Sequence, residues 1–176
     1  MIIVVMGVSG SGKTTVGRLL AQRLDAAFIE GDDLHPPENV AKMGSGTPLD
    51  DADRWGWLDT IGTRARVAHG TGRPVVVTCS ALKRVYRERL FAAMGAPPRF
   101  VFLKGGFDLL IERMNARPDH FMPPGLLRSQ LATLEEPDDD EDAITMDVAL
   151  PPGDLAGRAI AALHLQRSDE LGAESG

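Results

Sequence analysis

The sequence predicts an α/β fold in which helices cover both faces of a parallel β-sheet. Short apolar runs alternate with longer segments of helical period along the whole chain. The first run, residues 1–6 (MIIVVM), has no polar position, which is typical of a strand buried on both faces. Because such runs recur with helical segments between them, we expect a three-layer α/β/α arrangement around a five-stranded parallel sheet.

The expected strands are short segments rich in apolar and β-branched residues. They cover residues 1–6, 26–33, 73–80, 99–105 and 144–150. The third segment contains three successive valines, which favours a buried position within the sheet. The second segment ends in Asp32 and Asp33, so it brings two acids to the end of a strand.

The segments between these strands have the spacing of amphipathic helices. From Lys13 to Leu24, apolar residues recur at the three- and four-residue intervals of a helical stripe. The other expected helices cover residues 53–70, 82–94, 107–117, 126–137 and 153–166. Residues 167–176 are polar and are expected to fray, so the sequence predicts a single domain over residues 1–166.

Composition excludes several classes of function. A chain of 176 residues fits one domain, and its net charge of −6 gives no basic field to hold nucleic acid or an anionic membrane. The single cysteine, Cys79, rules out an internal disulfide framework. No apolar run approaches the roughly 20 residues that span a bilayer, and residues 1–6 lack the features of a signal peptide. We therefore expect a cytoplasmic protein without nucleic-acid or membrane partners.

A glycine-rich loop follows the first strand. Residues 7–16 read GVSGSGKTTV and satisfy the pattern G-x-x-x-x-G-K-[ST] between a strand and a helix. In that context the loop N–H groups and the helix N-terminus form an anion site, Lys13 reaches the β- and γ-phosphates, and the Thr14 hydroxyl ligates Mg²⁺. A chance glycine–serine turn is the alternative, but chance matches rarely fall in this context. The nucleotide-binding residues predicted from the loop are Gly7, Ser9, Gly10, Ser11, Gly12, Lys13, Thr14 and Thr15.

The sequence beyond the loop resembles the gluconate kinases of the thermoresistant gluconokinase type. The most particular matching segments are GDDLHP, KMGSGTPLDDADR and CSALK, and the resemblance runs from about residue 2 to 151 in the order of that family. It implies a P-loop kinase fold with a mobile lid over residues 117–128. It also implies a homodimer that uses ATP and Mg²⁺ to phosphorylate the 6-hydroxyl of D-gluconate, giving 6-phospho-D-gluconate and ADP.

The acceptor end of the site is expected at the carboxyl edge of the sheet. Asp32 stands at the end of the second strand, beside the loop, where it can accept or orient the proton of the attacking hydroxyl. Asp32 and Asp33 can instead cap the following turn. Family members tend to carry an apolar residue where Asp33 stands and an aspartate where Glu30 stands. No acid ends segment 73–80, so Asp32 is also expected to serve Mg²⁺ through water.

Several cations are candidates for the carboxylate end of the substrate. Lys42 and Arg54 flank a turn-rich segment, and Arg54 is favoured because its planar guanidinium can pair with a carboxylate bidentately. The alternative for Arg54 is a salt bridge with a neighbouring aspartate of residues 50–53. Lys83 follows a central strand and is a second candidate for the carboxylate, and Ser80 is a candidate for a hydroxyl or a Mg²⁺-bound water.

The remaining candidates are a histidine after the second strand, two arginines and Gln130. The resemblance implies that His35 contacts substrate hydroxyls, although it can also be an exposed loop residue, since the adjacent prolines disfavour helix there. Arg113 and Arg117 lie four residues apart on one helical face and are expected to act on ATP, with Arg117 as the catalytic lid arginine. The alternative for either arginine is an ion pair with Glu112 or Asp119. Gln130 is a possible polar substrate contact.

Three further segments are expected to be structural. Cys79 is interpreted as a buried apolar residue rather than a nucleophile, and Trp55 and Trp57 are expected to pack against the core. The acidic run of residues 135–142 is interpreted as solvated surface rather than a metal site. A shikimate or nucleoside-monophosphate kinase, and a non-enzymatic nucleotide sensor, remain as alternative functions.

Overall fold

The computed structural model describes residues 1–116 and 124–173, and within them the predicted parallel sheet is present. Its strands lie in the order β2-β3-β1-β4-β5, and every adjacent pair is parallel. The strands are β1 (Ile2–Met6), β2 (Ala27–Glu30), β3 (Val75–Cys79), β4 (Arg99–Lys104) and β5 (Ala143–Asp147). The all-parallel order confirms the α/β prediction.

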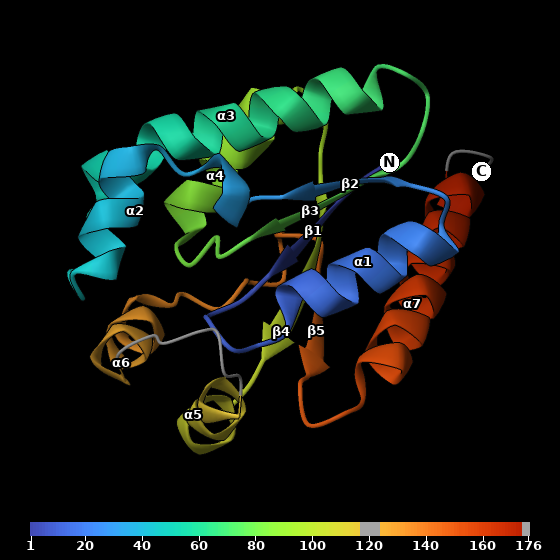
Figure 1. Ribbon diagram of the computed structural model, residues 1–176. Coiled ribbons are helices and arrows are strands. Elements are labelled where there is room, and N and C mark those ends of the chain that lie inside the picture. Colours follow the sequence, from blue (N-terminus) through green and yellow to red (C-terminus); the bar gives the residue numbers. More distant parts are fainter. Residues whose placement is uncertain (117–123, 174–176) are drawn as a thin grey trace.

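Helices cover both faces of this sheet. α1 (Lys13–Arg23) and α7 (Pro152–Ala173) pack together on one face, and α3 (Asp51–His69) and α4 (Arg84–Met94) pack on the other (Figure 1). The three layers predicted from the sequence are therefore confirmed. Within the described residues, no helix combines the length and the apolar character needed to cross a bilayer.

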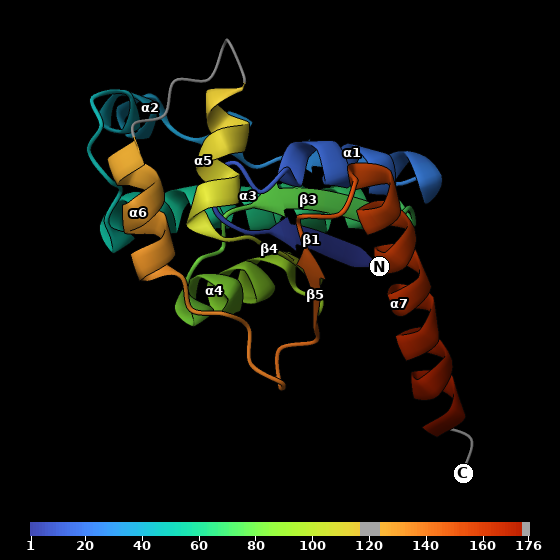
Figure 2. The same cartoon turned by 90° about the horizontal axis from the view of Figure 1, so that it is seen from below.

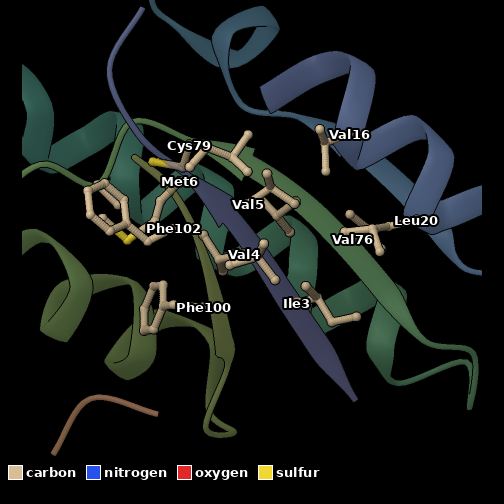
Figure 3. Close-up of a cluster of buried hydrophobic side chains, with 14 of the residues drawn as sticks. Ile3, Val4, Val5, Met6, Val16, Leu20, Val76, Cys79, Phe100 and Phe102 are labelled. Atoms are coloured by element: carbon tan, nitrogen blue, oxygen red, sulfur yellow. The ribbon is translucent and has the colours of Figure 1, made fainter. Parts of the chain in front are cut away.

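The core lies between the sheet and the two helical layers. All residues of β1 and β3 are buried, as the continuous apolar runs predicted. Val16 and Leu20 of α1 lie over Val5 and Val76 of these strands (Figure 3). Each such side chain contributes about 1.5–3 kcal/mol when fully buried, so this central pair of strands anchors the loops at its carboxyl end.

Three further helices gather at the carboxyl end of the strands. They are α2 (Pro37–Gly44), α5 (Phe107–Asn115) and α6 (Pro124–Thr133), and they lie away from the N-terminus and α7 (Figures 1 and 2). The sequence analysis did not predict α2, because it treated the two prolines as helix-breaking. Pro37 instead opens the helix at its first turn, where the missing N–H costs no hydrogen bond.

Some element boundaries differ from the sequence prediction. β2 ends at Glu30, and Asp32–Leu34 form a short 3-10 helix, so the strand predicted to 33 is shorter. α3 begins at Asp51 because Asp50 and Asp53 form a reciprocal capping box. α7 extends to Ala173, beyond the end that the apolar pattern predicted at 166.

Candidate active site

The glycine-rich loop lies between β1 and α1, as predicted, and two of its glycines have different reasons for lacking a side chain. Gly7 has φ +142°, and a Cβ there would lie 2.7 Å from the Leu103 carbonyl oxygen. Gly12 has φ +92°, and a Cβ there would meet no atom within 4 Å. Gly7 is thus required for packing against β4, whereas Gly12 borders open space of the kind that a phosphate needs.

Two buried polar side chains of the loop, Lys13 and Ser11, make few hydrogen bonds among the described residues. The Lys13 Nζ donates to the Val8 carbonyl oxygen at 3.1 Å, and the lysine is only 9% exposed. The Ser11 hydroxyl is buried and has no hydrogen-bond partner among the described residues. Thr14 and Thr15 are exposed on the first turn of α1. A buried cation and an unpaired hydroxyl beside open space fit an anionic ligand.

Three acids lie where β2 ends. Glu30 is the one that sequence reasoning passed over: one carboxylate oxygen accepts a hydrogen bond from Thr78, and the other is buried without a partner among the described residues. Its position at the strand end, beside β3, was the available signal. Asp32 and Asp33 are both exposed. Neither exposure nor hydrogen bonding separates these two aspartates.

His35 lies in a stacked arrangement with an indole ring of the core. The rings of His35 and Trp57 are 4.0 Å apart at 14°, and the Trp57 Nε1 donates to the Gly31 carbonyl oxygen at 2.7 Å. Burial lowers the pKa of His35; the nearby Asp32 charge opposes this shift, and Arg54 adds to it. His35 is therefore ordered beside Asp32 rather than an exposed loop residue, and Trp57 is in the core as expected.

Arg54 is a buried cation with few partners. It is 8% exposed, its Nη2 donates weakly to the Leu49 carbonyl oxygen at 3.4 Å, and its Nε has no hydrogen-bond partner in the part of the chain that the structure describes. Within the described residues it forms no ion pair, so the alternative of a salt bridge to a neighbouring aspartate is not what the structure contains. Arg54 lines a pocket together with Met43, Pro48, Leu49, Leu82, Leu126, Ser129, Gln130 and Thr133.

The neighbouring aspartates pair with lysines instead. Lys42 Nζ lies 3.2 Å from a carboxylate oxygen of Asp50 and 2.5 Å from one of Asp53, and these contacts raise the pKa of Lys42. Lys83 Nζ lies 2.8 Å from Asp51, which raises the pKa of Lys83 in the same way. Both candidate lysines are thus already paired with carboxylates, and their contact with substrate stays a prediction.

The loop after β3 is held against the glycine-rich loop. The Ser80 carbonyl oxygen accepts a hydrogen bond from the Gly7 N–H at 3.3 Å. Ala81 follows with φ +45°, a left-handed conformation that costs a residue with a Cβ about 1 kcal/mol or more. Cys79 is fully buried, and burial raises the pKa of its thiol to about 12, so it is not an activated nucleophile.

The predicted arginines and the lid are only partly described. Arg113 donates from Nη2 to the Val148 carbonyl oxygen at 2.6 Å. Arg117 and the first part of the predicted lid, residues 117–123, lie outside the described residues, and residues 124–128 belong to α6. Gln130 of α6 accepts a hydrogen bond from the Ser9 N–H of the loop at 2.7 Å.

The acids of residues 135–142 are mostly exposed, as the interpretation of a solvated surface predicted, and Glu141 is the exception. Glu141 is buried beside Arg87, whose Nε and Nη2 donate to its two carboxylate oxygens at 2.5 and 2.7 Å. Arg84 pairs with Asp140 at 2.7 Å. Arginines of α4 therefore fix this segment, because their charges outweigh the mutual repulsion of its acids.

The parallel sheet and the loop between β1 and α1 define the class of P-loop kinases. A protein-family profile described as the AAA domain matches residues 2–137. A crystal structure of a gluconokinase from Sinorhizobium meliloti 1021 superimposes with a TM-score of 0.86 at 48% identity, over 99% of this chain and 97% of that one.

Two relatives cover most of the chain. Gluconokinase of Gluconobacter oxydans (strain 621H) is 52% identical over 146 residues, which cover 81% of this chain and 79% of that protein. Thermoresistant gluconokinase of Escherichia coli (strain K12) is 44% identical, with 85% and 86% covered. The chain belongs to the gluconokinase family, so the resemblance inferred from its motifs is confirmed.

Proposed function

We infer that this protein transfers the γ-phosphoryl group of ATP to the 6-hydroxyl of D-gluconate, giving 6-phospho-D-gluconate and ADP. The observation that carries this inference is Arg54, a buried guanidinium with no carboxylate partner among the described residues, in a pocket that reaches the phosphate loop through Gln130. A sugar acid supplies the missing carboxylate, which makes burial of that charge favourable.

Different residues are proposed to bind the two ends of the acceptor, its carboxylate and its reacting hydroxyl. Arg54 holds the carboxylate, with His35, Lys42, Ser80 and Lys83 along the rest of the acceptor. Asp32 accepts the hydroxyl proton as the oxygen–phosphorus bond forms and the bond to the departing ADP oxygen breaks. Lys13, with Arg113 and Arg117, stabilises charge on the transferred phosphoryl group. Exposure of Asp32 beside the ordered His35 supports this division.

We propose that Mg²⁺ accompanies ATP. The residues present fit such an ion. Thr14 offers a hydroxyl at the start of α1, and Glu30 has a buried carboxylate oxygen that has no partner among the described residues and is suited to a metal-bound water. Asp32 is a second candidate for such a water. The ion would neutralise charge on the β- and γ-phosphate oxygens.

The oligomeric state and the location of the protein are also proposals. The family resemblance implies a homodimer, and sedimentation equilibrium would measure the mass in solution. The net charge of −6 and the single, buried cysteine support a cytoplasmic protein that binds neither nucleic acid nor membrane.

The test is ADP release measured with gluconate, shikimate and AMP as acceptors, for the wild type and for Arg54→Leu and Arg54→Lys. We expect turnover with gluconate only, and a gluconate KM raised at least tenfold in Arg54→Leu with partial recovery in Arg54→Lys. Turnover with shikimate or AMP alone would favour the alternative kinases. No turnover with any acceptor, despite ATP binding, would favour the nucleotide sensor.

A further inference from the structure

One hydrogen bond joins the phosphate loop to a helix of the acceptor pocket. The Ser9 N–H donates to Oε1 of Gln130 at 2.7 Å, across 121 residues of sequence. Because a backbone N–H can only donate, the amide atom that faces it must be the oxygen. The Gln130 Nε2 is therefore a donor directed elsewhere, and it has no partner among the described residues.

Gln130 belongs to two sites at once. It lines the pocket that contains Arg54, and it contacts the loop whose N–H groups bind phosphates. α6, which carries it, also contributes Leu126, Ser129 and Thr133 to the pocket lining. A planar amide with its oxygen held on one side presents its N–H group in a direction set by that contact.

We propose that Gln130 is a positioning residue that aligns the acceptor with the phosphate loop. Its Oε1 stays on the Ser9 N–H, and its Nε2 donates to a hydroxyl or carboxylate oxygen of a polyhydroxy acid held by Arg54. This proposal rests on the assignment of the Arg54 pocket to the acceptor. The two ligands then bind cooperatively, because each one orders the same side chain for the other.

A competing role makes the opposite prediction. If Oε1 instead occupied the Ser9 N–H in place of a phosphate oxygen, Gln130 would oppose ATP, and its removal would tighten ATP binding. In the competing role, removal of Gln130 raises the affinity for ATP and leaves the affinity for gluconate unchanged. In the proposed role, it lowers the affinity for gluconate.

The experiment is calorimetric titration of gluconate, with and without a non-hydrolysable ATP analogue, on the wild type, Gln130→Met and Gln130→Glu. Methionine keeps length and removes both polar groups, whereas glutamate keeps the acceptor for Ser9 and removes the donor. We expect both variants to lose the analogue-dependent gain in gluconate affinity. In the presence of the analogue, the dissociation constant of gluconate should rise about tenfold, the effect of about one hydrogen bond. Titration of the analogue alone should give an affinity for Gln130→Met that is unchanged within about twofold.

Thr60→Val is the matched control, since this threonine of α3 is exposed and its hydroxyl donates to the Gly56 carbonyl oxygen of its own helix. It should leave every constant unchanged. Tighter analogue binding by Gln130→Met, or an unchanged gain in gluconate affinity, would overturn the proposal. Arg54→Leu separates the two failures: if it binds gluconate normally, the pocket assignment is wrong, whereas a loss confined to Arg54→Leu refutes only the role of Gln130.

Discussion

Three aspartates stand within four residues of Arg54, yet each of them pairs with a lysine or a helix end in the described structure. Asp50 and Asp53 bind Lys42 and cap α3, and Asp51 binds Lys83. The sequence showed which charges were near one another but not how they pair, because pairing depends on the direction of each side chain from its helix. Arg54 lies on the buried side of α3 and has no carboxylate partner among the described residues.

A single-residue substitution can decide which of the two exposed acids after β2, Asp32 or Asp33, is the general base. Asp32→Asn keeps the shape of the side chain and removes the charge that accepts the hydroxyl proton. We expect kcat to fall by about 10²–10⁴, the usual contribution of a general base, while ATP affinity changes little. Asp33→Asn is the matched control and should stay within a few-fold. Steady-state kcat with ATP titration is the measurement, and a severe loss at Asp33 alone would transfer the role to that residue.

At the scale of elements, Arg87 of α4 joins a segment after α6 to the loop after β3. Arg87 of α4 donates to Glu141, to the Glu135 carbonyl oxygen at 2.9 Å and to the Ala81 carbonyl oxygen at 3.1 Å. The left-handed Ala81 is thus held by a buried guanidinium that needs Glu141 as its counter-charge. The Arg87 guanidinium also lowers the pKa of Glu141.

Single and double substitutions separate the charge pair from the loop contact. Arg87→Met removes the cation that accompanies the Glu141 carboxylate into the interior and leaves it with the Asp138 N–H as a donor. We expect the free energy of unfolding to fall by about 3–5 kcal/mol. Arg87→Met/Glu141→Met should recover most of that stability, because two apolar side chains replace the pair. kcat/KM should stay low in both, because Ala81 has lost its donor. Urea unfolding and steady-state kinetics give the two readouts, and full activity in the double variant would contradict the link.

The elements themselves were largely predictable, because each central strand is a continuous apolar run and the glycine pattern marks one loop. The parts that were not predictable depend on contacts far apart in the sequence. α2 is a different case, because both prolines were interpreted as helix-breaking although proline is favoured at the first position of a helix. The burial of the Glu141 side chain within the exposed acidic run was not predicted, because Arg87, which binds it, lies 54 residues earlier in the chain.

At the scale of the whole molecule, nucleotide binding should stabilise the fold as a unit, because the loop joins the middle strand of the sheet, β1, to α1. At an ATP analogue concentration 100 times its dissociation constant, linkage adds about 2.7 kcal/mol. For a chain of this size we expect a Tm increase of about 5–10 °C. Lys13→Ala should keep the Tm of the free protein, since the described hydrogen bond of Lys13 is to a loop carbonyl, and should lose most of the increase.

Differential scanning calorimetry of both proteins, with and without the analogue, makes the comparison. An increase in Lys13→Ala as large as in the wild type would remove Lys13 from the nucleotide site. A lowered Tm of free Lys13→Ala would show that this lysine supports the fold as well.

The contacts of Arg87 with Glu141, Glu135 and Ala81 also have a consequence for folding during synthesis on the ribosome. α4 and the loop after β3 are made well before Glu141 and the final strand, β5. Until those residues emerge, Arg87 has no carboxylate to accompany it into the interior, and burying it alone would cost several kcal/mol. The phosphate loop belongs to the part of the chain that is made early, but the acceptor edge is completed only when synthesis has passed Glu141. A chain truncated before Glu141 is expected to hold nucleotide without a finished place for the sugar acid.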